Sequence, residues 1–194
     1  MRVQVLLWGQ VIGGNMGDKK EVKVLNYGHP LLRGKAEEVK ELSVVDRVII
    51  DDMLKVVDQF PALGLAAPQV GHNKRIIVVN TIADVIVIIN PVITSFSEEE
   101  SMSTEGCLSI LGATEEVSRP NKVMVSGLDP DFNEVGYEWE GVIAHIVQHE
   151  IDHLDGIMMV DHLKEFKRKR MLKKHRQYIR NNHMPVNAYS AFVK

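Results

Sequence analysis

Hydrophobic positions recur at helical spacing in a first segment, between residues 43 and 61. The apolar residues of this segment share one helical face: Val45, Ile49, Met53, Val56 and Phe60. Ser43 precedes this face as a candidate N-cap, and Asp46 follows it three residues later, the spacing of a capping box. Pro61 is a stop signal. The pattern predicts one amphipathic helix.

The segments that follow are short and rich in β-branched residues. Four of them predict strands: residues 75–79, 85–89, 92–96 and 122–126. Asn, Pro, Gly or Asp residues separate them, and several lie too close together for crossover helices. We therefore expect antiparallel pairing.

Two further helices are predicted in the second half of the chain. The first covers residues 141–154 and ends at Asp155-Gly156, where glycine is a typical helix stop. The second covers residues 163–180, where the apolar spacing is loose and most side chains should face solvent. Together these elements predict a mixed fold of helices and short antiparallel strands, and the length makes one domain the default.

Composition supports a globular chain of 194 residues, with 45% hydrophobic and 25% charged residues. No run of eighteen apolar residues exists, so we expect no membrane span. The apolar start resembles a signal peptide, but Gln4 and Gln10 interrupt it, so we interpret residues 1–22 as an extension of unknown role. The single cysteine, Cys107, excludes an intramolecular disulfide and suits a reducing compartment.

Charge is unevenly distributed along the chain. The formal net charge is −3. Residues 163–180 contain nine Lys or Arg and one Glu, so this segment carries +8 and the rest carries −11. A basic helix on an acidic body can bind a phosphate backbone, although a solvated helix face is an equally good interpretation.

The clearest chemical motif is H-E-x-x-H, formed by His149, Glu150 and His153 on the predicted helix 141–154. Residues at i and i+4 are about 40° apart around a helix, so both imidazoles can reach one cation. Glu150 then stands where its carboxylate can accept a proton from a metal-bound water. The helix carries apolar residues on its other face, which is typical of a core helix.

A catalytic site needs a third protein ligand. The extended motif H-E-x-x-H-x-x-G-x-x-H would place it at residue 159, but Met159 is not a suitable ligand. A downstream glutamate is the other protease arrangement, and only Glu165, within the basic segment, is available. Upstream, Cys107 offers a thiolate that would leave a fourth position open for water.

Three segments in this order resemble the peptide deformylases: residues 64–71 (GLAAPQVG), 105–109 (EGCLS) and 148–156 (QHEIDHLDG). The resemblance covers residues 23–165 and implies a compact single-domain α+β fold, with short antiparallel strands packed around a central metal-binding helix. It also implies removal of the N-formyl group from the initiator methionine of nascent peptides, releasing formate. By position it implies that Cys107, His149 and His153 hold one divalent metal ion. Fe(II) is expected, and Zn(II), Ni(II) or Co(II) also suit these ligands.

The resemblance also assigns the catalytic groups. Glu150 would act as general base and then pass the proton to the leaving amine. The Gln69 side-chain amide and the backbone N–H of Leu108 would stabilise charge on the formyl oxygen. Gly64, with the small residues after it, would leave space for a peptide to pair as a strand, and Glu105 would help hold the substrate main chain.

The methionine side chain needs its own pocket. His145 lies four residues before His149, but a three-histidine stripe spans about 12 Å, too far for one cation. We therefore expect His145 to line the methionine pocket with Leu63, Val142 and Ile146. The other histidines, including His175, are interpreted as ordinary surface or loop residues.

Some positions depart from the family pattern, and two other functions remain open. Ala62, Ser103 and Leu111 stand where the family commonly has glycine, a bulkier apolar residue and proline, which affects substrate preference. A zinc endopeptidase with a downstream ligand is one alternative function. An RNA- or ribosome-binding domain with a structural metal is the other.

The remaining expectations concern organisation, partners and location. We expect an extension at residues 1–22, a catalytic domain at 23–162 and a basic helix and tail at 163–194. The partners are N-formylmethionyl nascent peptides and, through residues 163–180, the ribosome, with no membrane or DNA. The resemblance places the protein in a bacterial cytoplasm or an organelle of bacterial descent.

Overall fold

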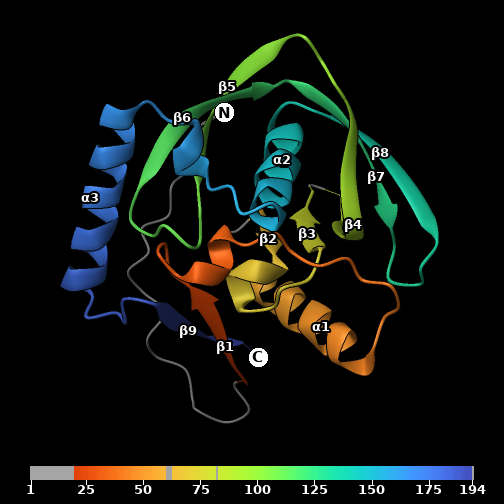
Figure 1. The fold of residues 1–194 in the computed structure, drawn as a ribbon, viewed down its shortest axis with the longest axis horizontal. Helices are drawn as coiled ribbons and strands as arrows, with labels where there is room; N and C mark the ends of the chain where they lie inside the picture. The colour runs from red at the N-terminus through yellow and green to blue at the C-terminus, as the bar shows by residue number, and fades with distance from the viewer. Residues whose placement is uncertain (1–19, 60–62, 82, 194) are drawn as a thin grey trace.

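The structure is a computed structural model that describes residues 20–59, 63–81 and 83–193 (Figure 1). The predicted roles of residues 1–19, and of Phe60, Pro61 and Ala62, lie outside these residues. The strands are β1 (Lys20–Leu25), β2 (Gly64–Ala66), β3 (Ile76–Asn80), β4 (Val85–Phe96), β5 (Glu100–Gly106), β6 (Thr114–Pro120), β7 (Lys122–Leu128), β8 (Glu134–Glu140) and β9 (Ala188–Val193). The helices are α1 (Val44–Gln59), α2 (Val142–Leu154) and α3 (Glu165–Asn181), with short 3-10 turns η1 (Pro30–Arg33), η2 (Ala67–Val70) and η3 (Met159–His162).

These strands form three antiparallel sheets. The largest has the order β2-β3-β4-β7-β8, while β5 pairs with β6 and β1 pairs with β9. Every pair of named strands is antiparallel, as the short connections predict. The mixed α+β single-domain prediction is confirmed.

The five-stranded sheet lies between α1 and α2. On β3, Ile76 and Val78 join the cluster that contains the apolar face of α1, whereas Ile77 and Val79 join the cluster under α2. Side chains alternate across a strand, so a strand covered on both faces reads as one apolar run. Figure 1 shows α2 at the centre of the molecule, between this sheet and the β5–β6 hairpin.

Local signals explain where α1 begins and where α2 ends. At the start of α1, the Ser43 backbone N–H donates to Asp46 (3.0 Å) and the Asp46 backbone N–H donates to Ser43 Oγ (3.1 Å), the reciprocal bonds of a capping box. Helix α2 ends before Gly156, which has φ +74°. A Cβ on Gly156 would lie 2.6 Å from the Arg33 carbonyl oxygen, so only glycine fits this turn.

The strand predictions were incomplete. Residues 85–89 and 92–96 were expected as two strands but form the single strand β4. Its register with β7 shifts between Ile89 and Val92, at Asn90, which has φ +50°. A bulge therefore bends one strand where the sequence suggested a turn. Strands β1, β2, β5, β6, β8 and β9 were not predicted.

The basic C-terminal helix was expected to face mainly solvent, and most of its side chains do. A stripe of Met171, His175 and Ile179 is nevertheless buried, so α3 packs onto the body. At the other end, β1 begins at Lys20 and pairs with β9. The division at residues 23 and 163 stays a prediction. Among the described residues, no helix is long and apolar enough to cross a membrane.

Candidate metal centre

Three potential ligands meet where α2 faces the end of β5. Cys107 follows β5 directly, and His149 and His153 lie one turn apart on α2. Their ligand atoms lie within 4.8 Å of one another, with 3.3 Å between Cys107 Sγ and His153 Nε2. All three side chains are buried. This is the one group of three such ligands that could hold an ion in the part of the chain that the structure describes.

The chemistry of these donors fits a divalent transition metal. One sulfur and two imidazole nitrogens are a ligand set of Zn(II) and related ions and leave further coordination positions open. Glu165, the downstream candidate ligand, is outside the group, is 78% exposed and pairs with Lys169. Among the open choices of third ligand, the structure therefore favours Cys107.

Glu105 fixes the orientation of the His149 ring. His149 Nδ1 donates to Glu105 Oε2 at 2.9 Å, which leaves the Nε2 nitrogen for a metal. Arg119 Nε donates to the other carboxylate oxygen of Glu105 at 2.5 Å. Both oxygens of Glu105 are therefore bonded to neighbouring side chains, and its contact with a substrate main chain stays a prediction.

Arg119 connects Glu105 of β5 to a second acidic residue, which lies on α2. Its side chain is 4% exposed and also donates to Asp152 at 2.7 Å, and Asp152 in turn accepts a bond from His162 (2.8 Å). Although burial raises the pKa of Glu105, bonds from His149 and Arg119 hold that pKa well below its usual range. Sequence reasoning gave no role to either residue, since Arg119 lies outside the three motifs and Asp152 occupies a variable position of H-E-x-x-H.

The two histidines have opposite electrostatic surroundings. Burial lowers the pKa of His149, but its contacts with Cys107 and Glu105 outweigh burial and raise that pKa well above its ordinary value. Burial and the neighbouring His149 lower the pKa of His153. The centre therefore contains one imidazole that binds a proton readily and one that binds a proton poorly. A cation bound by both rings would take the place of that proton.

Glu150 lies beside this centre in a space that a glycine provides. Its side chain is 4% exposed, and in the described residues its Oε2 atom has no hydrogen-bond partner. Burial raises the pKa of Glu150 to about 7. A Cβ on Gly64 of β2 would lie 2.5 Å from Glu150 Oε1, so a side chain at position 64 would collide with this carboxylate. Sequence analysis predicted space for a peptide at Gly64, and the structure shows space for Glu150.

Gln69 reaches the centre from η2. Its Oε1 accepts a bond from the Ala66 backbone N–H at 2.8 Å, which turns its amide nitrogen toward the ligands. Gln69 Nε2 donates to Ser109 Oγ at 3.4 Å and to Cys107 Sγ at 3.5 Å. Leu108, the other predicted donor, follows Cys107 and is buried.

Cys107 and His149 line one cavity of about 560 Å³. All predicted catalytic and substrate-binding residues line it: Leu63, Gly64, Gln69, Glu105, Leu108, Val142, His145, Ile146 and Glu150. Leu63 and Val142 are half exposed at its rim, whereas His145 is buried and its Nε2 lies 2.9 Å from Ser101 Oγ. The departures Ser103 and Leu111 also line the cavity.

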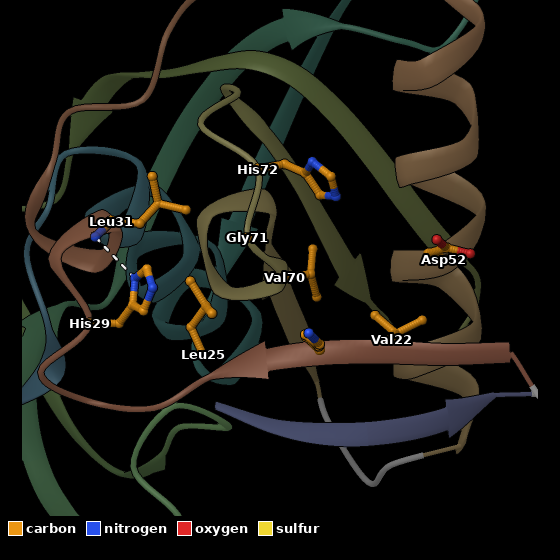
Figure 2. Close-up of a pocket in the computed structure, with 9 residues that line it drawn as sticks. Val22, Leu25, His29, Leu31, Asp52, Val70, Gly71 and His72 are labelled. Carbon is orange, nitrogen blue, oxygen red and sulfur yellow. Dashed lines mark hydrogen bonds between the residues drawn. The ribbon is translucent and has the colours of Figure 1, made fainter. Parts of the chain in front are cut away.

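A second hollow lies between η2 and β1 (Figure 2). It measures about 420 Å³ and is walled by β1, η1, η2 and α1. Val22, Leu25 and Val70 form its apolar part, and His29 accepts a bond from the Leu31 backbone N–H at its edge (Figure 2). None of the predicted site residues lines it.

Comparison with known proteins agrees with this geometry. Residues 21–169 match the model of the polypeptide deformylase family. The peptide deformylase of Thermodesulfovibrio yellowstonii is 42% identical over 158 residues, which is 79% of this chain and 95% of that protein. The peptide deformylase of Halothermothrix orenii is 44% identical over 142 residues, or 72% of this chain and 92% of that protein.

Solved structures give the same result. The crystal structure of peptide deformylase from Ehrlichia chaffeensis superposes with a TM-score of 0.79 at 32% identity, covering 85% of this chain and 100% of that chain. The crystal structure of peptide deformylase from Thermus thermophilus gives a TM-score of 0.73 at 39% identity, covering 81% of this chain and 95% of that chain. Sequence, fold and ligand cluster agree, and the chain belongs to the peptide deformylase family.

Proposed function

We propose that the chain removes the N-formyl group from the initiator methionine of nascent peptides and releases formate. The observation that carries this proposal is the position of Glu150, a buried carboxylate beside Cys107, His149 and His153, in one cavity large enough for a peptide end. The reaction adds water across the amide bond between the formyl carbon and the methionine nitrogen.

Cys107, His149 and His153 would hold the metal ion. A bound divalent cation supplies Lewis acidity, which brings the pKa of a bound water near 7. Glu105 keeps the His149 ring in the orientation that presents Nε2, and Arg119 keeps Glu105 ionised. Fe(II) is the proposed ion, with Zn(II), Ni(II) and Co(II) as alternatives that suit the same donors.

Glu150 would act as the general base. Its unpartnered Oε2 faces no competing donor among the described residues, so it is available to accept a proton from the attacking water. The same carboxyl then donates that proton to the methionine nitrogen as the amide bond breaks. Gly64 keeps the carboxylate in place by leaving no side chain in its path.

Gln69 and Leu108 would stabilise the charge that develops on the formyl oxygen. The bond between Gln69 Oε1 and the Ala66 N–H fixes the amide plane, and Gln69 Nε2 remains near Cys107. The Leu108 N–H comes from the residue after this ligand, so both donors lie near one edge of the metal centre.

The methionine side chain would enter between Leu63 and the first turn of α2. Val142, His145 and Ile146 line this part of the cavity. The peptide main chain would extend along β2, which is an edge strand of the five-stranded sheet and so can pair with an added strand near Gly64.

The decisive experiment is the substitution Glu150→Gln. Removing a general base costs about 10²- to 10⁴-fold in rate. We expect Glu150→Gln to bind metal normally and to lose deformylation of formyl-Met peptides by at least about 100-fold. Glu138→Gln, the same change on an exposed strand, is the matched control and should keep full activity. Full activity of Glu150→Gln would contradict the proposed mechanism.

Metal content distinguishes this function from the zinc endopeptidase alternative. Cys107→Ala removes one of three proposed ligands, so we expect the purified protein to lose its metal and its activity. An endopeptidase with a downstream ligand would keep its metal in this variant. Anaerobic metal analysis of the unaltered chain identifies the ion.

The protein would act in a bacterial cytoplasm or in an organelle of bacterial descent. There, the basic face of α3 would contact the ribosome. Lys173, Lys174 and Arg176 are exposed on this helix. Deleting α3 is an unsuitable test, because Met171, His175 and Ile179 are buried. Replacing the three exposed cations by Gln should reduce co-sedimentation with ribosomes at low salt. Unchanged co-sedimentation would dispose of this contact.

A further inference from the structure

The inner face of α3 contacts the loop that carries the Cys107 ligand. Figure 1 shows α3 beside β6, next to the segment that joins β5 to β6. His175 Nδ1 donates to the Leu111 carbonyl oxygen at 3.0 Å, and Tyr178 packs against the cluster that contains Leu108 and Leu111. The spacing of His175 and Tyr178 places both on one side of the helix.

Gly112 shows how closely Tyr178 approaches this loop. Gly112 has φ +76°, a conformation that favours glycine. A Cβ at this position would lie 2.4 Å from the Cγ and Cδ2 atoms of the Tyr178 ring. The ring therefore occupies the space of a missing side chain, and the two residues form a matched pair.

Tyr178 also lines the cavity that contains Glu150. Its lining includes Val142 and Ile146, which are proposed to contact methionine, and a second group, the 111–114 loop with Tyr178, which we call the second end. No role in the proposed reaction uses this second end. Its lining by Leu111, Ala113 and the tyrosine ring is largely apolar.

We propose that Tyr178 is a specificity-determining residue that contacts the side chain of the amino acid after the methionine and favours an apolar one. This inference rests on the proposed function. Once the formyl group lies at the metal centre and the methionine side chain lies near Val142, the remaining cavity is the end at Tyr178. An aromatic ring gains more from an apolar partner than from a polar one.

The experiment compares substrates that differ only after the methionine. Formyl-Met amide stops at the methionine, formyl-Met-Leu amide adds an apolar residue, and formyl-Met-Ser amide adds a polar one. We expect Tyr178→Ala to lower kcat/KM for formyl-Met-Leu amide about fivefold through KM, the value of one aromatic contact. Formyl-Met amide should be cleaved as before. Tyr178→Phe keeps the ring and should match the unaltered chain, and Gln177→Ala, an exposed neighbour, is the matched control.

Two results would overturn the proposal. Equal losses of kcat/KM on all three substrates in Tyr178→Ala would mean that Tyr178 only supports the loop. If Tyr178→Ala and the unaltered chain have equal kcat/KM on every substrate, Tyr178 contacts no substrate. Thermal unfolding of each variant separates a folding defect from a contact, and Tyr178→Leu supplies an apolar replacement if the alanine variant unfolds.

A binding measurement distinguishes this failure from failure of the proposed function. The products Met-Leu amide and Met amide bind without any reaction, so calorimetry reports the contact alone. We expect Tyr178→Ala to weaken binding of Met-Leu amide about fivefold and to leave Met amide unchanged. Unchanged binding of both products would overturn the contact, whereas an unaltered chain that binds both products but deformylates nothing would overturn the proposed function.

Discussion

The wall of the cavity built by α2 and the wall built by α3 use different interactions. On the α2 side, Glu105 and Arg119 are removed from water and bonded to one another. On the α3 side, a tyrosine ring rests on a glycine, one histidine bonds a carbonyl, and Glu115 pairs with the partly exposed Arg170.

The two sets of interactions differ in how well they tolerate substitution. A buried ion pair requires both partners, because either one alone is a charge without compensation. Its geometry is therefore strict, which suits a residue that orients a metal ligand. Ring packing and exposed ion pairs tolerate substitution at smaller cost, so the α3 wall can change substrate preference while the chemistry stays intact.

Replacing Arg119 should produce the largest effect. Arg119→Met removes the buried guanidinium that pairs with Glu105 and leaves only His149 bonded to this carboxylate, and breaking a buried ion pair costs about 3 to 5 kcal/mol of unfolding free energy. Urea unfolding of the metal-free protein measures this loss. Lys122→Met, which breaks an exposed pair with Glu138, is the control and should leave the midpoint unchanged. Equal midpoints for the two variants would mean that the buried pair contributes no more to stability than an exposed one.

Adding one methyl group at Gly64 should affect rate more than stability. The new Cβ would lie 2.5 Å from Glu150 Oε1, so the carboxylate must move. A displacement of about 1 Å can cost about 100-fold in rate, and we expect Gly64→Ala to lower kcat by that amount with metal still bound. Gly136→Ala is the matched control, since a Cβ there meets nothing within 4 Å. If kcat is unchanged, Glu150 has room that the structure does not show.

His175 on the α3 wall should give a pH-dependent contribution to stability. Burial holds the pKa of His175 below its ordinary value of 6.5. Below pH 6.5 the unfolded chain therefore binds a proton that the folded chain rejects, so stability falls as the pH falls toward the folded pKa. His175→Gln keeps a donor for Leu111 and should lose less stability between pH 7 and pH 5. His183→Asn, on an exposed residue, should follow the unaltered chain.

Glu115→Gln should have the smallest effect. Its own side chain is 9% exposed, but its partners Lys167 and Arg170 are 34% and 47% exposed, and ion pairs with solvent-exposed partners contribute less than about 1 kcal/mol. Salt screens such pairs, so any difference in melting temperature should vanish in about 1 M salt. A loss comparable with that of Arg119→Met would show that both walls depend on charge.

The metal centre was predictable because a helix fixes the relation of His149 to His153. Cys107 was available through the ordered motifs. The support around them was not predictable, because the β5–β6 register pairs Glu105 with Glu115 and Ser101 with Arg119, so Glu105 and Arg119 are not cross-strand partners and meet only through their long side chains. The interpretation of His175 as a surface residue was wrong, because burial on one side of a mostly charged helix leaves little trace in the sequence.

The missed strands have separate reasons. Strand β5 (ESMSTEG) and strand β6 (TEEVSRP) lack regular apolar alternation, since each buries few side chains. Strand β8 does alternate, because Val135, Tyr137 and Trp139 pack against the core while the positions between them, Gly136 and Glu138, are exposed, so its signal was present. Strands β1 and β9 pair with one another from opposite ends of the described residues, so neither has a pairing partner close to it in sequence.

The pairing of β1 with β9 makes synthesis of this protein unusually ordered. Lys20 pairs with Val193 and Leu25 pairs with Ala188, so β1 is translated long before its partner strand. Its backbone groups must wait, without this partner, until β9 has emerged from the ribosome. A protein proposed to process chains as they emerge therefore completes this sheet only after every other described helix and strand has been translated.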